Sequence, residues 1–294
     1  MPGMTEPLRI ALIGYGEVGK IFSRDFVAAG ASVSAYDILL KDPASAGAMH
    51  AHAQASRVRL GTDAADAASG ADIVISAVTA NAVSDVAAEA ATYLSERQVF
   101  LDVNSASPAT KKAAAAIVES CGAHYVEGAV MAPVGGVGIK VQILAGGKAA
   151  AATATRLNRL GMNMRPVGEE HGRASAMKLC RSIMIKGIEV LIADCATAAK
   201  LWNVEDEVFA SLTRSFPGTN FAELAVYMAE RVHTHGRRRA AEMREAAAML
   251  EELGLDSALA RAVAEAHDRK AQARHPGRIQ QEWTPVLRPN APST

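Results

Sequence analysis

Three glycines near the N-terminus have the spacing of a phosphate-binding turn. Gly14, Gly16 and Gly19 lie in the segment GYGEVG, after an apolar run that ends at Ile13 and before a segment with helical periodicity. The first glycine permits a tight turn, the second lets the backbone approach a diphosphate, and the third lets the helix pack on the strand. The free N–H groups that begin this helix would then face a bound phosphate.

An acidic residue follows this turn at the distance typical of a dinucleotide site. Asp37 ends the next apolar run, where a carboxylate accepts hydrogen bonds from a ribose 2′-OH and repels a 2′-phosphate. This favours NAD as the cofactor, and the nearby Lys41 leaves NADP possible. The alternative is a structural glycine turn that binds nothing. We expect the cofactor to contact Gly14, Tyr15, Gly16, Glu17, Val18 and Asp37.

The order of apolar and helical segments predicts an α/β fold, with a Rossmann-type doubly wound parallel sheet followed by an all-helical domain. Strands are predicted at Leu8–Ile13, Ser32–Tyr36, Asp72–Val78 and Val99–Val103, with later strand-like runs at His124–Val126, Val141–Leu144 and Asn163–Val167. Helices are predicted at Val18–Ala29, Val83–Leu94, Pro108–Cys121 and Ala149–Leu160. The helix at Pro108 has Ser107 as its N-cap.

The second half of the chain reads as helix throughout. A long helix is predicted over Ala174–Leu201, with Met177, Met184 and Ile188 forming a core stripe. Further helices are predicted at Val204–Leu212, Phe221–Val232, Arg237–Leu253 and Ser257–Ala273. We therefore predict an NAD(P)-binding domain over residues 1–168 and an all-helical substrate and dimerisation domain over 169–294. The tail from residue 275 holds four prolines and is predicted to be an arm or a frayed end.

Composition excludes several classes of function. The chain has 294 residues, and its 31 Lys and Arg balance 31 Asp and Glu, so no basic field favours nucleic acid or an anionic membrane. Cys121, Cys180 and Cys195 lie too far apart for a metal motif, and we predict no metal site. No signal-peptide segment and no apolar run of membrane-spanning length is visible, so we expect a cytoplasmic protein.

Together with the glycine turn, further segments resemble the β-hydroxyacid dehydrogenases, which include 3-hydroxyisobutyrate dehydrogenase and the cofactor domain of 6-phosphogluconate dehydrogenase. The segment DVNSASP, from Asp102, resembles the family's D-x-S-T-x-x-P stretch near the nicotinamide ribose. The resemblance implies that Asn104 and Ser105 contact the cofactor there. It also implies that Val78 and Thr79, at the end of a predicted strand, line the cofactor.

Lys178 is the candidate catalytic residue. The segment GRASAMKL resembles the family's helix that carries a catalytic lysine a few residues after a glycine. Transfer of a hydride from an alcohol carbon requires a base for the hydroxyl proton, and a partly desolvated lysine can serve as that base. Ser182 lies one helical turn later and would face the same site. The alternative is a solvated lysine on a long helix.

The substrate-binding residues depart from the family pattern. Met131 stands where the family has a serine in its substrate loop, and Ser182 stands where it has an asparagine. His235 belongs to a cationic patch that includes Arg237, Arg238 and Arg239. We interpret this patch as a solvated face paired with Glu242 and Glu245, and the alternative is recognition of an anionic group on the substrate. The predicted substrate contacts are therefore Met131, Ser182 and His235.

These observations predict an NAD(P)-dependent dehydrogenase that oxidises a hydroxy acid or related polar alcohol, or reduces the matching carbonyl. A small molecule would bind in the cleft between the two domains. We expect a homodimer or higher homo-oligomer, with the helical domain as the interface. Three alternatives remain open. An imine reductase is favoured by Met131 and Ser182 and disfavoured by Lys178. The others are an oxidative decarboxylase and a non-catalytic cofactor-binding protein.

Overall fold

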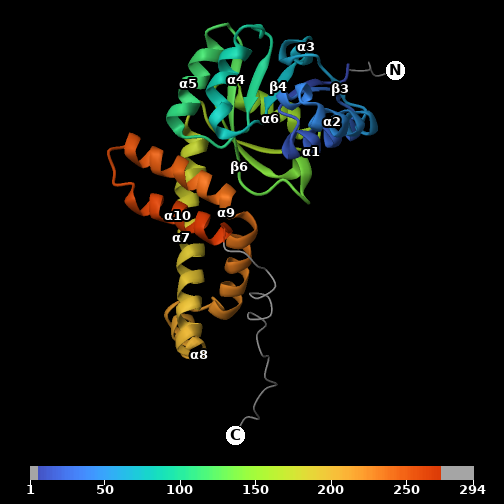
Figure 1. The fold of residues 1–294 in the computed structure, drawn as a ribbon. Helices are drawn as coiled ribbons and strands as arrows, with labels where there is room; N and C mark the ends of the chain where they lie inside the picture. Colours follow the sequence, from blue (N-terminus) through green and yellow to red (C-terminus); the bar gives the residue numbers. More distant parts are fainter. Residues whose placement is uncertain (1–5, 273–294) are drawn as a thin grey trace. The chain divides into compact units, whose positions relative to one another are not determined.

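The computed structural model describes residues 6–272, which divide into two compact units (Figure 1). The first unit takes in residues up to Arg181 together with Glu251–Gly254, and the second takes in Ser182–Leu250 and residues from Leu255 onward. The predicted boundary after residue 168 coincides with the end of the last strand, whereas the division lies inside helix α7 (Arg173–Trp202). The predicted C-terminal arm lies outside the described residues. No described helix has the length and hydropathy to span a membrane.

The first unit is built on an eight-stranded sheet with the order β3-β2-β1-β4-β5-β6-β7-β8. Neighbouring strands are parallel except for β6 and β7, which are antiparallel. The strands are β1 (Arg9–Ile13), β2 (Ser32–Tyr36), β3 (Arg59–Leu60), β4 (Ile73–Ser76), β5 (Val99–Asp102), β6 (His124–Val130), β7 (Gln142–Gly146) and β8 (Asn163–Gly168). The predicted doubly wound parallel sheet is confirmed, and β6 and β7 form its antiparallel pair.

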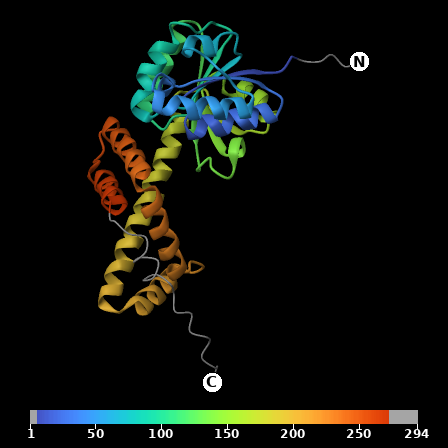
Figure 2. The same ribbon diagram turned by 45° about the vertical axis from the view of Figure 1, so that its right-hand side comes forward.

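Helices cover both faces of this sheet (Figure 2). One face packs against α1 (Glu17–Ala28), α2 (Pro43–Ser56) and α6 (Ala150–Asn158). The other face packs against α3 (Ala64–Ala68), α4 (Val83–Ala90) and α5 (Pro108–Glu119). Short 3₁₀ helices follow three of the strands, at η1 (Ile38–Lys41), η2 (Ala80–Ala82) and η3 (Gly138–Lys140). With both faces covered, the central strands β1, β4 and β5 are mostly apolar and buried, as expected for a buried parallel sheet.

The carboxyl ends of the parallel strands meet at one edge of the sheet. The chain crosses from β1 to β2 on one side and returns to β4 on the other side of β1, so the strand order reverses at β1. In open α/β sheets, ligands bind at the carboxyl ends of the strands beside such a reversal. The glycine turn, Asp37, Val78 and Ser105 all follow strands that end at this edge.

The second unit consists of helices, which confirms the predicted all-helical region. It comprises the rest of α7, α8 (Glu205–Ser215), most of α9 (Phe221–Glu252) and α10 (Ala258–Gln272). The prediction of two helices separated near Gly236 was wrong, because α9 is continuous. A Cβ at Gly236 would lie 2.6 Å from the His267 carbonyl oxygen, so this glycine allows α10 to pack closely against α9. It does not end the helix.

The predicted core stripe on α7 was also wrong. Met177 and Met184 are exposed, with 61% of Met184 accessible, and Ile188 is only partly buried. The buried face of the helix includes the polar residues Ser175, Ser182, Lys186 and Glu189. The spacing of apolar residues shows which face of a helix is apolar. That face can be assigned to the core only when the opposite face is exposed to solvent, and the opposite face of α7 is partly buried.

Candidate functional site

The glycine-rich turn leaves room in front of the first helix of the sheet. Gly14 has φ +98°, and a Cβ there would overlap the Ala77 carbonyl oxygen. A Cβ at Gly19 would likewise overlap the Gly14 carbonyl oxygen, whereas a Cβ at Gly16 would meet nothing within 4 Å. Gly16 is also the N-cap of α1 and provides no side-chain hydrogen bond to the first N–H groups. Free amides beside empty space fit a diphosphate.

Asp37 connects this turn to the end of β2. Its two carboxylate oxygens accept the N–H of Tyr15 at 2.6 Å and the N–H of Leu39 at 2.9 Å. The Tyr15 ring is buried, its hydroxyl is hydrogen-bonded to His52 Nδ1 at 2.8 Å, and burial raises the pKa of the phenol. The turn therefore presents the backbone of Tyr15 to a ligand, while Asp37 retains lone pairs for a ribose hydroxyl.

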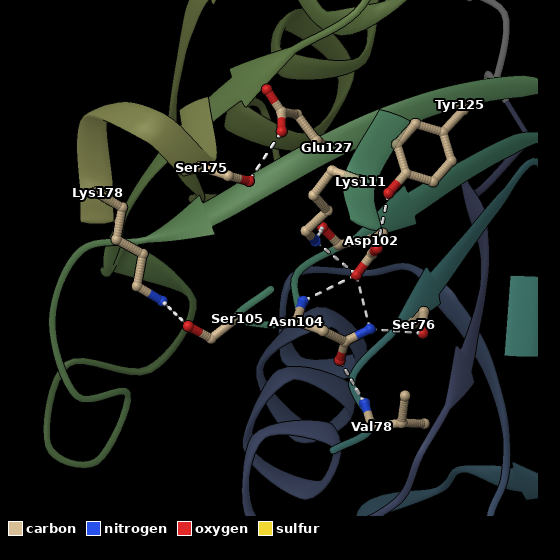
Figure 3. Close-up of polar contacts among 10 residues, drawn as sticks. All are labelled: Ser76, Val78, Asp102, Asn104, Ser105, Lys111, Tyr125, Glu127, Ser175 and Lys178. Atoms are coloured by element: carbon tan, nitrogen blue, oxygen red, sulfur yellow. Dashed lines mark hydrogen bonds and ion pairs between the residues drawn. The ribbon is translucent and has the colours of Figure 1, made fainter. Parts of the chain in front are cut away.

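A buried carboxylate organises the end of β5 (Figure 3). Asp102 accepts hydrogen bonds from the backbone and the side-chain amide of Asn104, at 2.9 and 2.6 Å, and from the Tyr125 hydroxyl at 2.7 Å. It also forms an ion pair with the fully buried Lys111 at 2.8 Å. We call Asp102, Asn104, Lys111 and Tyr125 the strand-end network. Burial and the neighbouring Asp102 raise the pKa of Tyr125, so its hydroxyl remains a donor.

The amide of Asn104 joins two strand ends. Its oxygen accepts the Val78 N–H at 2.6 Å, and its nitrogen donates to Ser76 Oγ at 2.9 Å as well as to Asp102. These contacts fix the loop that follows β4 against the loop that follows β5. Thr79 comes next in the chain and is the N-cap of η2, with no side-chain cap hydrogen bond.

The structure brings Lys178 to this edge of the sheet. Its Nζ donates to Ser105 Oγ at 3.1 Å, and both residues belong to the first unit (Figure 3). Met131 lies in the same unit and packs against a small apolar cluster of Ala129, Leu144 and Ala174, and Ala174 lies in the first turn of α7. The predicted catalytic lysine, one predicted cofactor residue and one predicted substrate residue thus lie around the start of α7.

Two of the predicted substrate residues belong to the second unit. Ser182 is buried and its hydroxyl accepts a hydrogen bond from Lys186 Nζ at 3.0 Å. Its position on α7 is one turn after Lys178, as the spacing predicts. His235 is exposed on α9. Among the described residues, no group of three or more His, Cys, Asp or Glu could hold a metal ion.

The interpretation of the cationic patch as a solvated face was wrong for Arg239. This residue is buried, and its guanidinium donates to both oxygens of the fully buried Glu189, at 2.9 and 2.7 Å. Arg231 donates to the same carboxylate at 3.0 Å. We call Glu189, Arg231 and Arg239 the helix-pair network. Glu242, the predicted partner of the patch, forms an ion pair with Lys186 at 2.6 Å.

Sequence reasoning missed three buried charged residues near the site: Asp102 as a hub, Lys111 and Glu127. A signal for Lys111 was present, because it lies on the same helical stripe as the buried Ala114, Ala115 and Val118 of α5. Glu127 lies within the buried strand β6, flanked by apolar residues on both sides. A charged residue within an apolar pattern indicates a buried partner.

Two family models match parts of the chain. Residues 9–106 match a family described as NADP oxidoreductase, coenzyme F420-dependent. Residues 199–269 match a domain of unknown function, DUF1932. The first match covers the glycine turn, Asp37 and Ser105 in the loop after β5. The second match covers most of the helical unit.

Solved structures of similar proteins cover nearly the whole chain. A conserved hypothetical protein from Sinorhizobium meliloti is 39% identical, with 93% of this chain and 92% of that chain covered and a TM-score of 0.80. A conserved protein of unknown function, described as structurally similar to 3-hydroxyacid dehydrogenases, is 30% identical over 93% of this chain and 99% of that chain, with a TM-score of 0.75.

A 3-hydroxyisobutyrate dehydrogenase from Mycobacterium tuberculosis shares the fold, with a TM-score of 0.74, 19% identity and coverage of 91% of this chain and 94% of that chain. The chain belongs to the β-hydroxyacid dehydrogenase family, as a divergent branch with a Rossmann-type NAD(P)-binding fold.

Proposed function

We propose that the protein is an NAD(P)-dependent oxidoreductase that oxidises a hydroxy acid or related polar alcohol, or reduces the matching carbonyl, with Lys178 as the general acid and base. The observation that carries this proposal is the position of the Lys178 amine. It lies 3.1 Å from Ser105 Oγ, at the carboxyl edge of the sheet that also bears the glycine turn. Ligands of open α/β sheets bind at this edge.

The residues of the first unit fit a nicotinamide dinucleotide. The amides of the first turn of α1 and the space at Gly16 would hold the diphosphate, and Asp37 would accept the adenosine ribose hydroxyl. The loops that Asn104 fixes after β4 and β5 would hold the nicotinamide half. When bound, the nicotinamide gives or accepts a hydride at the substrate carbon.

Lys178 would manage the proton that accompanies this transfer. A neutral amine accepts the proton of a substrate hydroxyl, and the protonated amine returns it to the oxygen in the reverse reaction. Ser105 accepts a hydrogen bond from the amine and so restricts the directions in which Nζ can point. Restricting a catalytic group to the productive direction removes part of the entropic barrier.

We propose NAD as the preferred cofactor. The Asp37 carboxylate is held in place by the Tyr15 and Leu39 N–H groups, so a 2′-phosphate would meet a fixed negative charge. Lys41 is the last residue of η1 and is exposed. It is the one residue of that 3₁₀ helix whose positive charge could attract a 2′-phosphate. Titration with both nucleotides tests this: NAD should bind more tightly, and Asp37→Asn should move the ratio of the two affinities toward NADP. Equal affinities in the unaltered protein would contradict the preference.

The test of the reaction is a nicotinamide absorbance assay on the purified protein. Hydroxy acids, aryl alcohols, aldehydes and imines would be screened with each nucleotide, with Lys178→Ala and the exposed-lysine control Lys148→Ala alongside. We expect turnover of a hydroxy acid or polar alcohol to fall by about 10²–10⁴-fold in Lys178→Ala, with nucleotide affinity unchanged. Lys148→Ala should behave as the unaltered protein.

Two other outcomes would replace the proposal. Turnover of imines that survives Lys178→Ala would identify an imine reductase, consistent with the apolar packing of Met131 where the family has a serine. Nucleotide binding without turnover on any substrate class would identify a cofactor-binding protein.

A further inference from the structure

Helix α7 begins without a capping side chain of its own. Gly172 immediately precedes the helix, and its carbonyl accepts the Ala176 N–H at 2.9 Å, which makes it the N-cap. Most helices place Ser, Thr, Asp or Asn at this position to satisfy an N–H of the first turn. Gly172 has φ +90°, and a Cβ there would approach Lys112 Cε at 3.0 Å and Pro108 Cβ at 3.1 Å. The first N–H groups of α7 therefore require an acceptor from another element.

Glu127, on β6, provides that acceptor, and Figure 3 shows its contact with the Ser175 hydroxyl. Its Oε1 accepts the Ala174 N–H at 2.7 Å, and its Oε2 accepts the Ser175 hydroxyl at 2.9 Å. The side chain is fully buried, and among the described residues it forms no ion pair. A buried carboxylate without a cation is stabilised here by N–H and O–H donors and by the positive end of the helix dipole.

The neighbouring strand is shaped to receive this carboxylate. Gly146 on β7 is the register partner of Glu127. A Cβ at Gly146 would lie 2.5 Å from Glu127 Oε1 and 3.0 Å from its Cγ. A side chain at position 146 would therefore displace the carboxylate from the first turn of α7.

The anchored turn leads directly to the catalytic lysine. Lys178 follows Ala174 by four residues, which is one helical turn, and its amine contacts Ser105. Ser105 follows Asp102, which pairs with Glu127 in the register of β5 and β6. The start of α7 is therefore fixed to β6 through Glu127, and the end of the lysine side chain is fixed to the loop after β5.

We propose that Glu127 is a positioning residue for Lys178: it caps α7 from the neighbouring strand and so fixes where the lysine amine meets Ser105. This inference rests on the proposed function in one respect, which is that Lys178 takes part in turnover. The anchoring itself is independent of that function and can be measured without a substrate.

The test compares Glu127→Gln and Ser175→Ala with the control Glu119→Gln. Glu119 is a partly exposed carboxylate whose partner, His171, lies just before α7, so the control removes an acid near the helix without touching its first turn. Amide hydrogen exchange would be followed over residues 173–178. The reactivity of the Lys178 amine would be followed by competitive acylation and mass spectrometry. Ser175→Ala keeps the carboxylate and remains informative if Glu127→Gln folds poorly.

We expect hydrogen exchange of the first turn of α7 to accelerate about tenfold in Glu127→Gln, with faster acylation of Lys178, and both changes to be smaller in Ser175→Ala. With substrate, kcat should fall about 10- to 100-fold while nucleotide affinity and KM stay unchanged. Glu119→Gln should show none of these changes.

Unchanged exchange and acylation in Glu127→Gln would overturn the anchoring, whatever happens to turnover. Altered exchange and acylation with undiminished turnover would support the anchoring and overturn the catalytic role proposed for Lys178. A loss of turnover caused by weaker nucleotide binding would overturn the positioning role, because a misplaced lysine should affect kcat alone.

Discussion

The two units each bury a carboxylate that forms an ion pair, but they use it differently. In the strand-end network, Asp102 accepts a backbone N–H, an amide, a phenol and a lysine ammonium, all around the loops at the edge of the sheet. In the helix-pair network, the hydrogen bonds that Glu189 of α7 accepts from described side chains come from two guanidinium groups, both on α9. The first arrangement fixes irregular backbone near the proposed ligand site, and the second joins two regular helices.

The difference shows what determines the role of a buried charge. The N–H groups of a loop are not paired within a helix or a sheet. A carboxylate that accepts their hydrogen bonds therefore fixes the conformation of the loop. Helices satisfy their own backbone, so a buried ion pair between them acts only on side-chain packing and on the register of the two helices. Removing either carboxylate should therefore destabilise the protein, but only one should change ligand binding.

The largest expected effect is the loss of stability from neutralising either hub. Asp102→Asn leaves the fully buried Lys111 without its ion-pair partner, and Glu189→Gln removes the ion-pair partner of the mostly buried Arg239. Each should therefore lower the free energy of unfolding by about 3–5 kcal/mol. Denaturant unfolding measures this loss, and nucleotide titration separates the two variants. Affinity for the nucleotide should fall in Asp102→Asn alone. A comparable loss of affinity in Glu189→Gln would remove the distinction between the networks.

A smaller effect is expected from filling the space beside Glu127. Gly146→Ala should lower the free energy of unfolding by about 1–3 kcal/mol, because its Cβ would lie 2.5 Å from Glu127 Oε1. Turnover should fall with it. The control is Gly47→Ala in α2, where a Cβ meets nothing within 4 Å. Equal thermal midpoints for the two variants would show that the carboxylate can move aside freely.

The helix unit should also respond to pH through His267. Burial lowers the pKa of this histidine to about 4, while the Lys186 carbonyl accepts its Nε2–H at 3.3 Å. The unfolded chain binds a proton near the ordinary pKa of about 6.5, so stability is complete above that pH and decreases as the pH falls toward about 4. Thermal midpoints measured from pH 7 to 5 should decline. His267→Gln should flatten that decline, and an equally steep decline in the variant would assign it to another group.

The smallest effect is expected at Gly187 on α7. A Cβ there would meet nothing within 4 Å, so Gly187→Ala should raise the free energy of unfolding by about 0.5–1 kcal/mol through helix propensity. Thermal midpoints measured at several protein concentrations check this. A variant that loses stability, above all at high concentration, would show that another surface packs against this position and that the helix unit does not act alone.

Much of the first unit could be predicted from local patterns. Ser107 followed by Pro108 predicted the start of α5, and the structure shows Ser107 Oγ accepting the Thr110 N–H at 3.2 Å. The same signal, Asp42 followed by Pro43, begins α2 and was missed. Helix α2 is rich in alanine and buries only Met49 and Ala53, so its apolar periodicity is weak. Helix α3 spans only five residues, too few for periodicity to be detected.

The sequence by itself determined the glycine turn and the alternation of most strands and helices, because these depend on short-range spacing and backbone conformation. The resemblance to a known family indicated the candidate lysine. Only the tertiary structure decided which charges are buried. Glu127 and Arg239 find their partners in elements far away in the chain, as Glu127 does with Ala174. The environment of a charge depends on those distant partners, and no local pattern contains them.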